Sequence, residues 1–110
     1  PRFLNGVQKQ FFQLKFFIMY ALVHHQISDP EKFLAITQSG ATFPAGFEVL
    51  AFLPDAAHKT ATCIWEAPDT TSLRNLLEPV LSNTAVNSYL AIDETIALGL
   101  SKLKEAELHA

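Results

Sequence analysis

The clearest pattern along the chain is an unbroken apolar segment that leads straight into a helix start. Residues 16–27 are β-branched, aromatic and aliphatic, apart from two adjacent histidines and a glutamine near the end, and contain no Gly or Pro. This pattern predicts a strand. Residues 28–31 have the sequence SDPE, which is typical of a capping box with Ser28 as N-cap and a proline in the first turn. We therefore expect a helix up to about Thr37, ended by Gly40.

The hydrophobic pattern then continues through a hairpin, a second helix and a final strand. Residues 47–53 and 60–66 are two apolar segments separated by Pro54 and a short polar connection, which predicts paired strands. Residues 68–80 carry leucines at helical spacing, and residues 88–93 form a fourth strand-like segment. The order βαββαβ predicts an α+β, ferredoxin-like fold, with a four-stranded antiparallel sheet and both helices on one face.

Length and composition indicate that the chain forms one globular domain. The chain has 110 residues, of which 49% are hydrophobic and 17% charged, as expected for a globular domain with a core of its own. We assign residues 16–100 to that domain and residues 1–15 to an N-terminal extension, which is either an arm across a partner or an addition without function. Residues 101–110 are rich in Ala, Glu, Leu and Lys and predict a short helical tail that frays.

The first two strands are apolar on both faces. Along the first strand, Phe17, Met19, Ala21 and Val23 alternate with Phe16, Ile18, Tyr20 and Leu22. Along the second strand, Leu50 and Phe52 alternate with Val49, Ala51 and Leu53. A sheet face in contact with water is expected to carry polar residues at alternate positions. Two helices cover only one face, so we expect the other face to pack against a second copy of the sheet in a homodimer.

Several segments carry a resemblance to a known superfamily. The run MYALVHHQISDPEKFLAI, the hairpin FEVLAFLP and TATCIWEAPD, the helix SLRNLLEPVL and the final NSYLAIDE resemble the dimeric α/β-barrel superfamily, in particular its small, mostly uncharacterised bacterial members. The resemblance covers residues 18–100 and implies that two ferredoxin-like sheets dimerise into an α/β barrel. Members include cofactor-free monooxygenases, lactone isomerases, haem-binding enzymes, stress proteins and nickel-binding proteins, so the resemblance predicts the fold rather than one activity.

Charge and cysteine content narrow the classes of partner. The net charge is −3, and all eleven acidic residues lie at or after Asp29. An acidic body of this kind disfavours nucleic acid as a partner. The apolar run of residues 16–23 is too short to span a bilayer, so no membrane partner is expected. The single cysteine, Cys63, excludes an internal disulfide and favours a cytoplasmic location.

The adjacent histidines are the first candidates for chemistry. Neighbouring strand residues point to opposite faces, so His24 and His25 do not chelate one ion together from a regular strand. The alternation places His25 on the helix-packed face and His24 on the face between the two sheets, together with Tyr20. The dimeric α/β-barrel resemblance implies a pocket on the face of His24. The alternative is that both histidines are half-buried residues at the end of a strand.

Two residues on other strands were considered as partners of His24. Glu66 ends the third strand on the face opposite Trp65, where its carboxylate could orient the imidazole or complete a metal site. Tyr89 lies on the fourth strand, beside the first, and could present its hydroxyl to the same cavity. The alternatives are a solvated Glu66, a Trp65 in the core and a Tyr89 that anchors a dimer. Cys63, in mid-strand, is expected to be an inert core thiol.

Two functional hypotheses follow, beside a third in which the dimer itself is the functional product and no ligand is bound. The first is a binding module that holds a small molecule or a transition metal through His24 and Glu66, with Tyr20 and Tyr89 as further ligand contacts; these donors suit nickel, zinc or copper. The second is a cofactor-independent monooxygenase or isomerase with His24 as general base. Glycine-rich phosphate loops, HExxH and nucleophile-elbow motifs do not occur in the sequence, and the sequence names no cofactor.

Overall fold

The computed structural model describes residues 18–109, with side chains as far as Glu105. The elements follow in the order β1 (Met19–Ile27), α2 (Pro30–Thr37), β2 (Glu48–Pro54), β3 (Thr60–Ala67), α3 (Thr70–Leu81), β4 (Ala85–Ala91) and α4 (Leu100–His109). The predicted N-terminal extension, residues 1–15, lies outside the described residues, as does the start of the predicted first strand. In the part of the chain that is described, no helix is long and apolar enough to cross a membrane.

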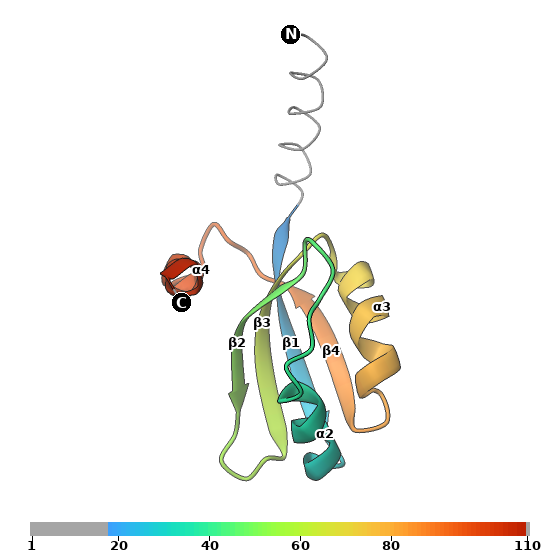
Figure 1. Ribbon diagram of the computed structural model, residues 1–110. Coiled ribbons are helices and arrows are strands. Elements are labelled where there is room, and N and C mark those ends of the chain that lie inside the picture. Colours follow the sequence, from blue (N-terminus) through green and yellow to red (C-terminus); the bar gives the residue numbers. More distant parts are fainter. Residues whose placement is uncertain (1–17, 110) are drawn as a thin grey trace, which may run out of the picture.

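The four strands form one antiparallel sheet in the order β2-β3-β1-β4 (Figure 1). The predicted α+β class, the antiparallel sheet and the β2–β3 hairpin are therefore confirmed. The expectation that the third and fourth strands both neighbour the first is also confirmed, because β1 pairs with β3 on one side and with β4 on the other. β1 is thus one of the two central strands, from which a side chain can meet partners on two neighbours.

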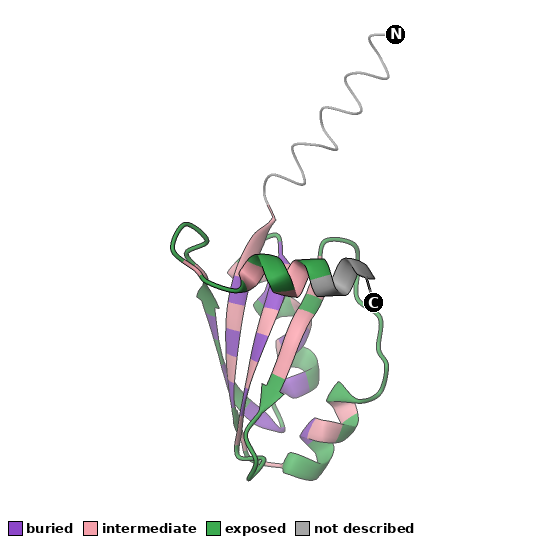
Figure 2. Cartoon of the chain, turned by 90° about the vertical axis from the view of Figure 1, so that its left-hand side faces the viewer, coloured by how far each residue is buried: buried purple, intermediate pink, exposed green. Residues whose placement is uncertain are grey.

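The two faces of the sheet are covered differently. Along β1 and β3, buried residues alternate with half-buried ones, which appear as purple and pink bands in Figure 2. The buried face carries Ala21, Val23 and His25 of β1, and α2 and α3 pack on it. The other face, called the open face below, carries Tyr20, Leu22 and His24 of β1, Thr62, Ile64 and Glu66 of β3, Val86, Ser88 and Leu90 of β4, and Glu48, Ala51 and Leu53 of β2.

The start of α2 differs from the prediction by one residue. Asp29, not Ser28, is the N-cap, and its side chain accepts a hydrogen bond from the Lys32 amide at 3.1 Å. Pro30 occupies the first helical position, where a missing N–H costs nothing, so the residue before it is the cap. The backbone amides of Ser28 and Asp29 both donate to the carbonyl of Thr84, which ties this connection to the one before β4.

Two strand assignments also need correction. β4 begins at Ala85, three residues before the predicted residue 88, because Asn87 is a strand residue rather than part of the polar loop. In β2 the register shifts between Val49 and Ala51, which is the signature of a β-bulge. Val49 and Phe52 consequently pair with Trp65 and Cys63 of β3 and share one face, whereas a regular strand would separate them.

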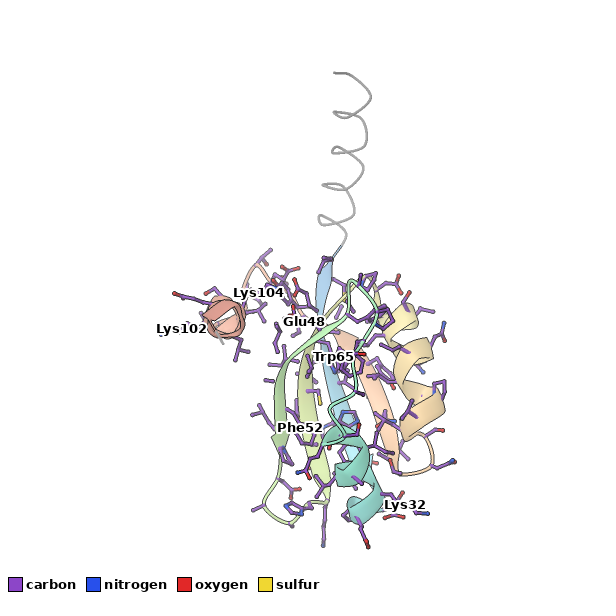
Figure 3. The ribbon with its side chains drawn as sticks, in the orientation of Figure 1. Lys32, Glu48, Phe52, Trp65, Lys102 and Lys104 are labelled. Carbon is purple, nitrogen blue, oxygen red and sulfur yellow. The ribbon has the colours of Figure 1, made fainter. Side chains whose placement is uncertain are left out.

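The C-terminal helix α4 corresponds to the predicted helical tail and contacts the sheet. It lies beside β2 and away from α2 and α3 (Figure 1). Lys104 extends from α4 toward Glu48 at the start of β2 (Figure 3), with 3.2 Å between Nζ and Oε2, and it also forms an ion pair with Glu66 of β3. Lys104 is the described cation that joins α4 to the open face.

Candidate functional site

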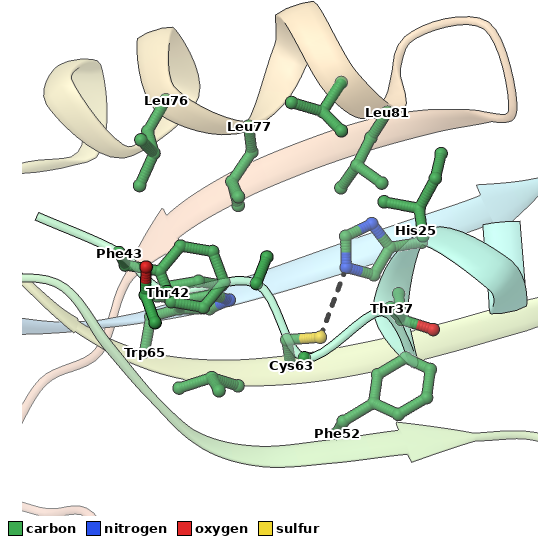
Figure 4. Close-up of a pocket in the computed structure, with 15 residues that line it drawn as sticks. His25, Thr37, Thr42, Phe43, Phe52, Cys63, Trp65, Leu76, Leu77 and Leu81 are labelled. Atoms are coloured by element: carbon green, nitrogen blue, oxygen red, sulfur yellow. Dashed lines mark hydrogen bonds between the residues drawn. The ribbon is translucent and has the colours of Figure 1, made fainter.

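A cavity of about 360 Å³ lies between the buried face of the sheet and helices α2 and α3 (Figure 4). This size lies within the usual range of small-molecule pockets, about 300–1,000 Å³. The side chains around the cavity are mostly aliphatic and aromatic, with His25, Thr37, Thr42 and Cys63 as the polar exceptions. The full lining comprises His25, Ile36, Thr37, Gly40, Ala41, Thr42, Phe43, Val49, Phe52, Cys63, Trp65, Leu76, Leu77, Val80 and Leu81.

The local sequence explains why space remains at this position. α2 has only eight residues, so it covers about 12 Å of the sheet at the helical rise of 1.5 Å per residue. The connection that follows contains Gly40 and Ala41, and β3 presents Cys63 toward the cavity. These small side chains leave volume that larger residues would fill, whereas Phe43 and Trp65 close one end with their rings 4.9 Å apart in an edge contact.

His25 is the most buried polar side chain at the cavity, with 1% of its surface exposed. Its Nδ1 lies 2.6 Å from Oδ1 of Asn87 on β4, and its Nε2 lies 3.3 Å from Sγ of Cys63 on β3. Both partners are on strands that neighbour β1. The position of β1 in the middle of the sheet order therefore allows one histidine to contact both strands.

The amide of Asn87 determines the tautomer of His25. Asn87 Nδ2 donates to Glu78 Oε2 at 3.0 Å and to the carbonyl of Ala85 at 3.4 Å, so the amide nitrogen faces two acceptors. Its oxygen is thus the atom that faces His25 and accepts a hydrogen bond from Nδ1–H. His25 Nε2 then carries the lone pair, and the Cys63 thiol donates to it.

Burial keeps the hydrogen-bonded side chains of His25 and Cys63 neutral. Desolvation lowers the pKa of His25 below its usual range, against the smaller opposing effect of the hydrogen bond to Asn87. Burial likewise raises the pKa of the Cys63 thiol to about 12. At neutral pH the pair is therefore a neutral imidazole and a protonated thiol, connected through Asn87 to the half-buried carboxylate of Glu78 on α3.

Trp65 adds a donor to the same cavity. It is 4% exposed, and its Nε1–H is buried without a hydrogen-bond partner among the described residues. Figure 4 shows Trp65 and His25 at opposite ends of the cavity with Cys63 between them. The indole lies close enough to the Cys63 thiol to lower its pKa, against the larger effect of burial, but its Nε1–H does not meet hydrogen-bond geometry with the sulfur or with any other described acceptor. The assignment of Trp65 and Cys63 to the helix-packed face is confirmed.

The structure separates the predicted site residues. His24 is half-buried on the open face, opposite His25, as expected, and Tyr20 and Glu66 pair across β1 and β3 on the same face. His24 instead pairs with Thr62 and Ser88. It lies four residues from Tyr20 along β1, or about 13 Å at the strand rise of 3.3 Å per residue. The predicted joint metal site of His24 and Glu66 is therefore not assembled within this chain.

The other residues predicted beside His24 have different partners. Glu66 forms an ion pair with Lys104 of α4, and its place opposite Tyr20 keeps its carboxylate away from the His24 imidazole. The pKa of the Tyr20 phenol is raised, first by burial and then by the nearby Glu66 carboxylate. Among the described residues, no group of three or more His, Cys, Asp and Glu side chains has the arrangement of a metal site.

The placement of Tyr89 beside His24 is wrong. Tyr89 pairs with Val23, so its side chain points to the buried face, where it is 7% exposed. The guanidinium carbon of Arg74 on α3 lies 5.0 Å from the centre of the Tyr89 ring, a cation–π contact. Burial raises the pKa of the Tyr89 hydroxyl to about 12. The hydroxyl is buried without a hydrogen-bond partner in the described part of the chain.

Sequence reasoning missed Asn87 and Glu78, and it treated Cys63 as isolated. The signal for a polar contact on the buried face was present, because alternation already placed His25 and Cys63 on one face. Asn87 was hidden because residues 85–87 were not assigned to a strand.

Comparison with models of protein families, with curated proteins and with solved structures finds no match to this chain.

Proposed function

We propose that this domain binds a small, largely apolar molecule in the cavity between its sheet and helices α2 and α3. The observation that carries the proposal is the combination of a volume of about 360 Å³ with an apolar lining and a few polar groups. Ligand pockets are typically lined in this way, with polar groups that fix the orientation of the ligand. Here those groups are the hydrogen-bonded His25 and Cys63, and the unpartnered indole N–H of Trp65.

The chain contains its own reporter for this binding. Trp65 is the single tryptophan and lines the cavity, so a bound molecule changes the surroundings of the only indole. We expect 4-phenylbutan-2-one, an apolar aromatic ketone, to change the Trp65 fluorescence in a saturable way and to raise the melting temperature. Binding to the folded state stabilises it by mass action.

A matched pair of valines tests the position of the site. Val80 lines the cavity and is 51% exposed, whereas Val86 lies on the open face and is 69% exposed. Val80→Phe is expected to fill the cavity and weaken binding of the ketone at least about tenfold, which corresponds to 1.4 kcal/mol. Val86→Phe is expected to leave binding unchanged. Absence of saturable binding, or equal weakening by the two variants, contradicts the proposal.

We also propose that the open face packs against a second copy of the chain, giving the dimeric α/β barrel that the sequence suggests. Leu53, Val86 and Leu90 are more than half exposed on this face. Its two carboxylates among the described strand residues, Glu48 and Glu66, are both bound by Lys104. Two copies can therefore meet without bringing unpaired carboxylates together, which favours self-association of an apolar sheet.

Light scattering at micromolar concentration tests this arrangement. We expect the wild type to be a dimer and Leu90→Glu to be a monomer, because the variant places a carboxylate in the interface. Leu98→Glu is the control, since Leu98 is 98% exposed and lies outside the strands. A monomeric wild type contradicts the proposed dimer.

Cofactor-independent catalysis stays the alternative to binding. It requires a base at the cavity, and the histidine that lines the cavity is His25 rather than the predicted His24. Nothing in the geometry favours oxidation or isomerisation over binding.

A further inference from the structure

Cys63, His25 and Asn87 form one hydrogen-bonded line across three neighbouring strands, and this line ends at the cavity. Asn87 accepts from His25 Nδ1 at 2.6 Å, and His25 Nε2 faces the Cys63 thiol at 3.3 Å. A thiol, an imidazole with its lone pair toward that thiol, and an amide that orients the imidazole are the parts of an activated nucleophile. Cys63 and His25 both line the cavity, so a bound molecule lies within reach of the sulfur.

A second and independent observation concerns Trp65. Its buried Nε1–H has no hydrogen-bond partner among the described residues, although a buried donor without an acceptor is costly. Trp65 lies two residues after Cys63 on the same face of β3, which places the two backbones about 6.6 Å apart at the strand rise of 3.3 Å. This donor fits a ligand that brings an acceptor oxygen a few bonds away from an atom that reacts with sulfur.

We propose that the cavity captures α,β-unsaturated carbonyl compounds covalently, with Cys63 as the nucleophile, His25 as the base and Trp65 as the donor to the carbonyl oxygen. The proposal rests on the binding function described above and names the class of ligand for the same cavity.

The reaction is an addition and needs no further reactant. His25 Nε2 takes the thiol proton while Sγ forms a bond to the β-carbon of the ligand. The π electrons of the carbon–carbon double bond move to the carbonyl oxygen as an enolate, which the Trp65 N–H stabilises. His25 then returns the proton to the α-carbon. The product is a thioether of the saturated carbonyl compound, in which the atoms of thiol and ligand are all retained.

The surroundings make the thiol selective. Because burial holds the pKa of Cys63 at about 12 and lowers that of His25, the thiolate is not formed at rest. Proton transfer therefore accompanies attack on a ligand already held in the cavity. Cys63 is 5% exposed, so reagents too large for the cavity have no access to it in the folded chain.

The enone 4-phenylbut-3-en-2-one and its saturated counterpart 4-phenylbutan-2-one test the proposal. Cys63 is the single cysteine, so intact-mass spectrometry of the folded full chain measures the mass added at this residue. Cys63→Ser is the negative control. We expect one adduct on the wild type. His25→Gln is expected to form it at least about tenfold more slowly, and the saturated ketone is expected to slow the wild-type reaction by competition. His24→Gln is the matched control, because His24 lies on the open face, and its rate is expected to equal that of the wild type.

The two proposals fail in different ways. Saturable binding of 4-phenylbutan-2-one without an enone adduct overturns covalent capture and leaves the binding function standing. Absence of binding by the saturated ketone overturns both. An adduct that forms equally fast in His24→Gln and His25→Gln also overturns covalent capture. If His25→Gln does not fold, competition by the saturated ketone in the wild type decides, since an adduct rate that the ketone does not change overturns the proposal.

Discussion

The buried face and the open face of the sheet place residues of the same type in different surroundings. His25 on the buried face has a partner at each ring nitrogen, whereas its neighbour His24 is half-buried on the other side. Leucines show the same contrast, because Leu73 beneath the sheet is fully buried and Leu90 on the open face is 57% exposed. Residues of one type are thus buried in the core on one face and exposed on the other. Four predictions test whether this difference in burial produces a difference in stability.

The largest effect is expected for leucine truncation. Leu73→Ala leaves a cavity in the core, which typically costs about 2–5 kcal/mol, whereas Leu90→Ala in the isolated chain is expected to cost less than about 1 kcal/mol. Chemical denaturation followed by circular dichroism measures both. If the open face is buried in a dimer, the cost of Leu90→Ala grows with protein concentration, because association then contributes to stability. Equal costs at every concentration would remove the distinction between the faces.

The second prediction compares neighbouring polar residues of β4. Asn87→Ala removes the acceptor for His25 Nδ1 and the donor to Glu78. Buried groups left without partners are expected to cost about 2–3 kcal/mol of unfolding free energy. Ser88→Ala, one residue along and on the open face, is expected to change stability by less than about 0.5 kcal/mol. Urea denaturation of both variants decides the point, and a similar small effect for both would show that the buried network contributes little.

The third prediction is a pH dependence that belongs to His25. Its pKa is lowered by burial in the folded chain, so the unfolded chain binds a proton more readily. Stability is then fully present above the unfolded pKa of about 6.5 and falls as the pH drops below it, by up to about 1.4 kcal/mol per pH unit. Thermal unfolding between pH 7.5 and about 5 is expected to show this fall in the wild type and in His24→Gln. A fall of the same size in His25→Gln would assign the effect to other groups.

The smallest effect concerns α4. Lys104→Met removes the ion pairs with Glu48 and Glu66. Because these groups are partly exposed, the loss of global stability is expected to stay below about 1 kcal/mol. Hydrogen exchange is the more sensitive measurement, and the amides of α4 are expected to exchange faster while those of β1 do not change. Lys102→Met, an exposed position on the same helix, is the control, and equal acceleration by both variants would show that the ion pairs do not hold α4.

Much of the architecture was predictable because its signals are local. An apolar run without Gly or Pro predicted β1, and the alternating geometry of a strand predicted the opposite orientations of His24 and His25. Helical spacing predicted α3 even though Pro79 lies inside it. The boundaries were less accurate. The N-cap is Asp29 rather than Ser28 because Pro30 begins the helix, whereas the bonds of both preceding amides to Thr84 could not be predicted from the local pattern.

The site was less predictable than the fold, because it depends on which side chains meet across strands. Whether Glu66 reaches His24 depends on register, and Lys104 was available to bind the carboxylate only because α4 returns to the sheet. The reach of Asn87 to His25 likewise depends on the true start of β4. The homodimer, the ligand and the cytoplasmic location stay predictions.

The line from Glu78 through Asn87 and His25 to Cys63 also has a consequence for folding. It connects α3, β4, β1 and β3 through directional bonds in a core that is largely apolar. A slip of β4 by one residue along β1 would turn Asn87 toward the open face and bring a side chain without an amide to His25. The same slip would turn Ala85 and Tyr89 out of the core, and the buried imidazole would in addition lose its acceptor. The polar line therefore adds a penalty against this misalignment and favours the register in which Asn87 meets His25.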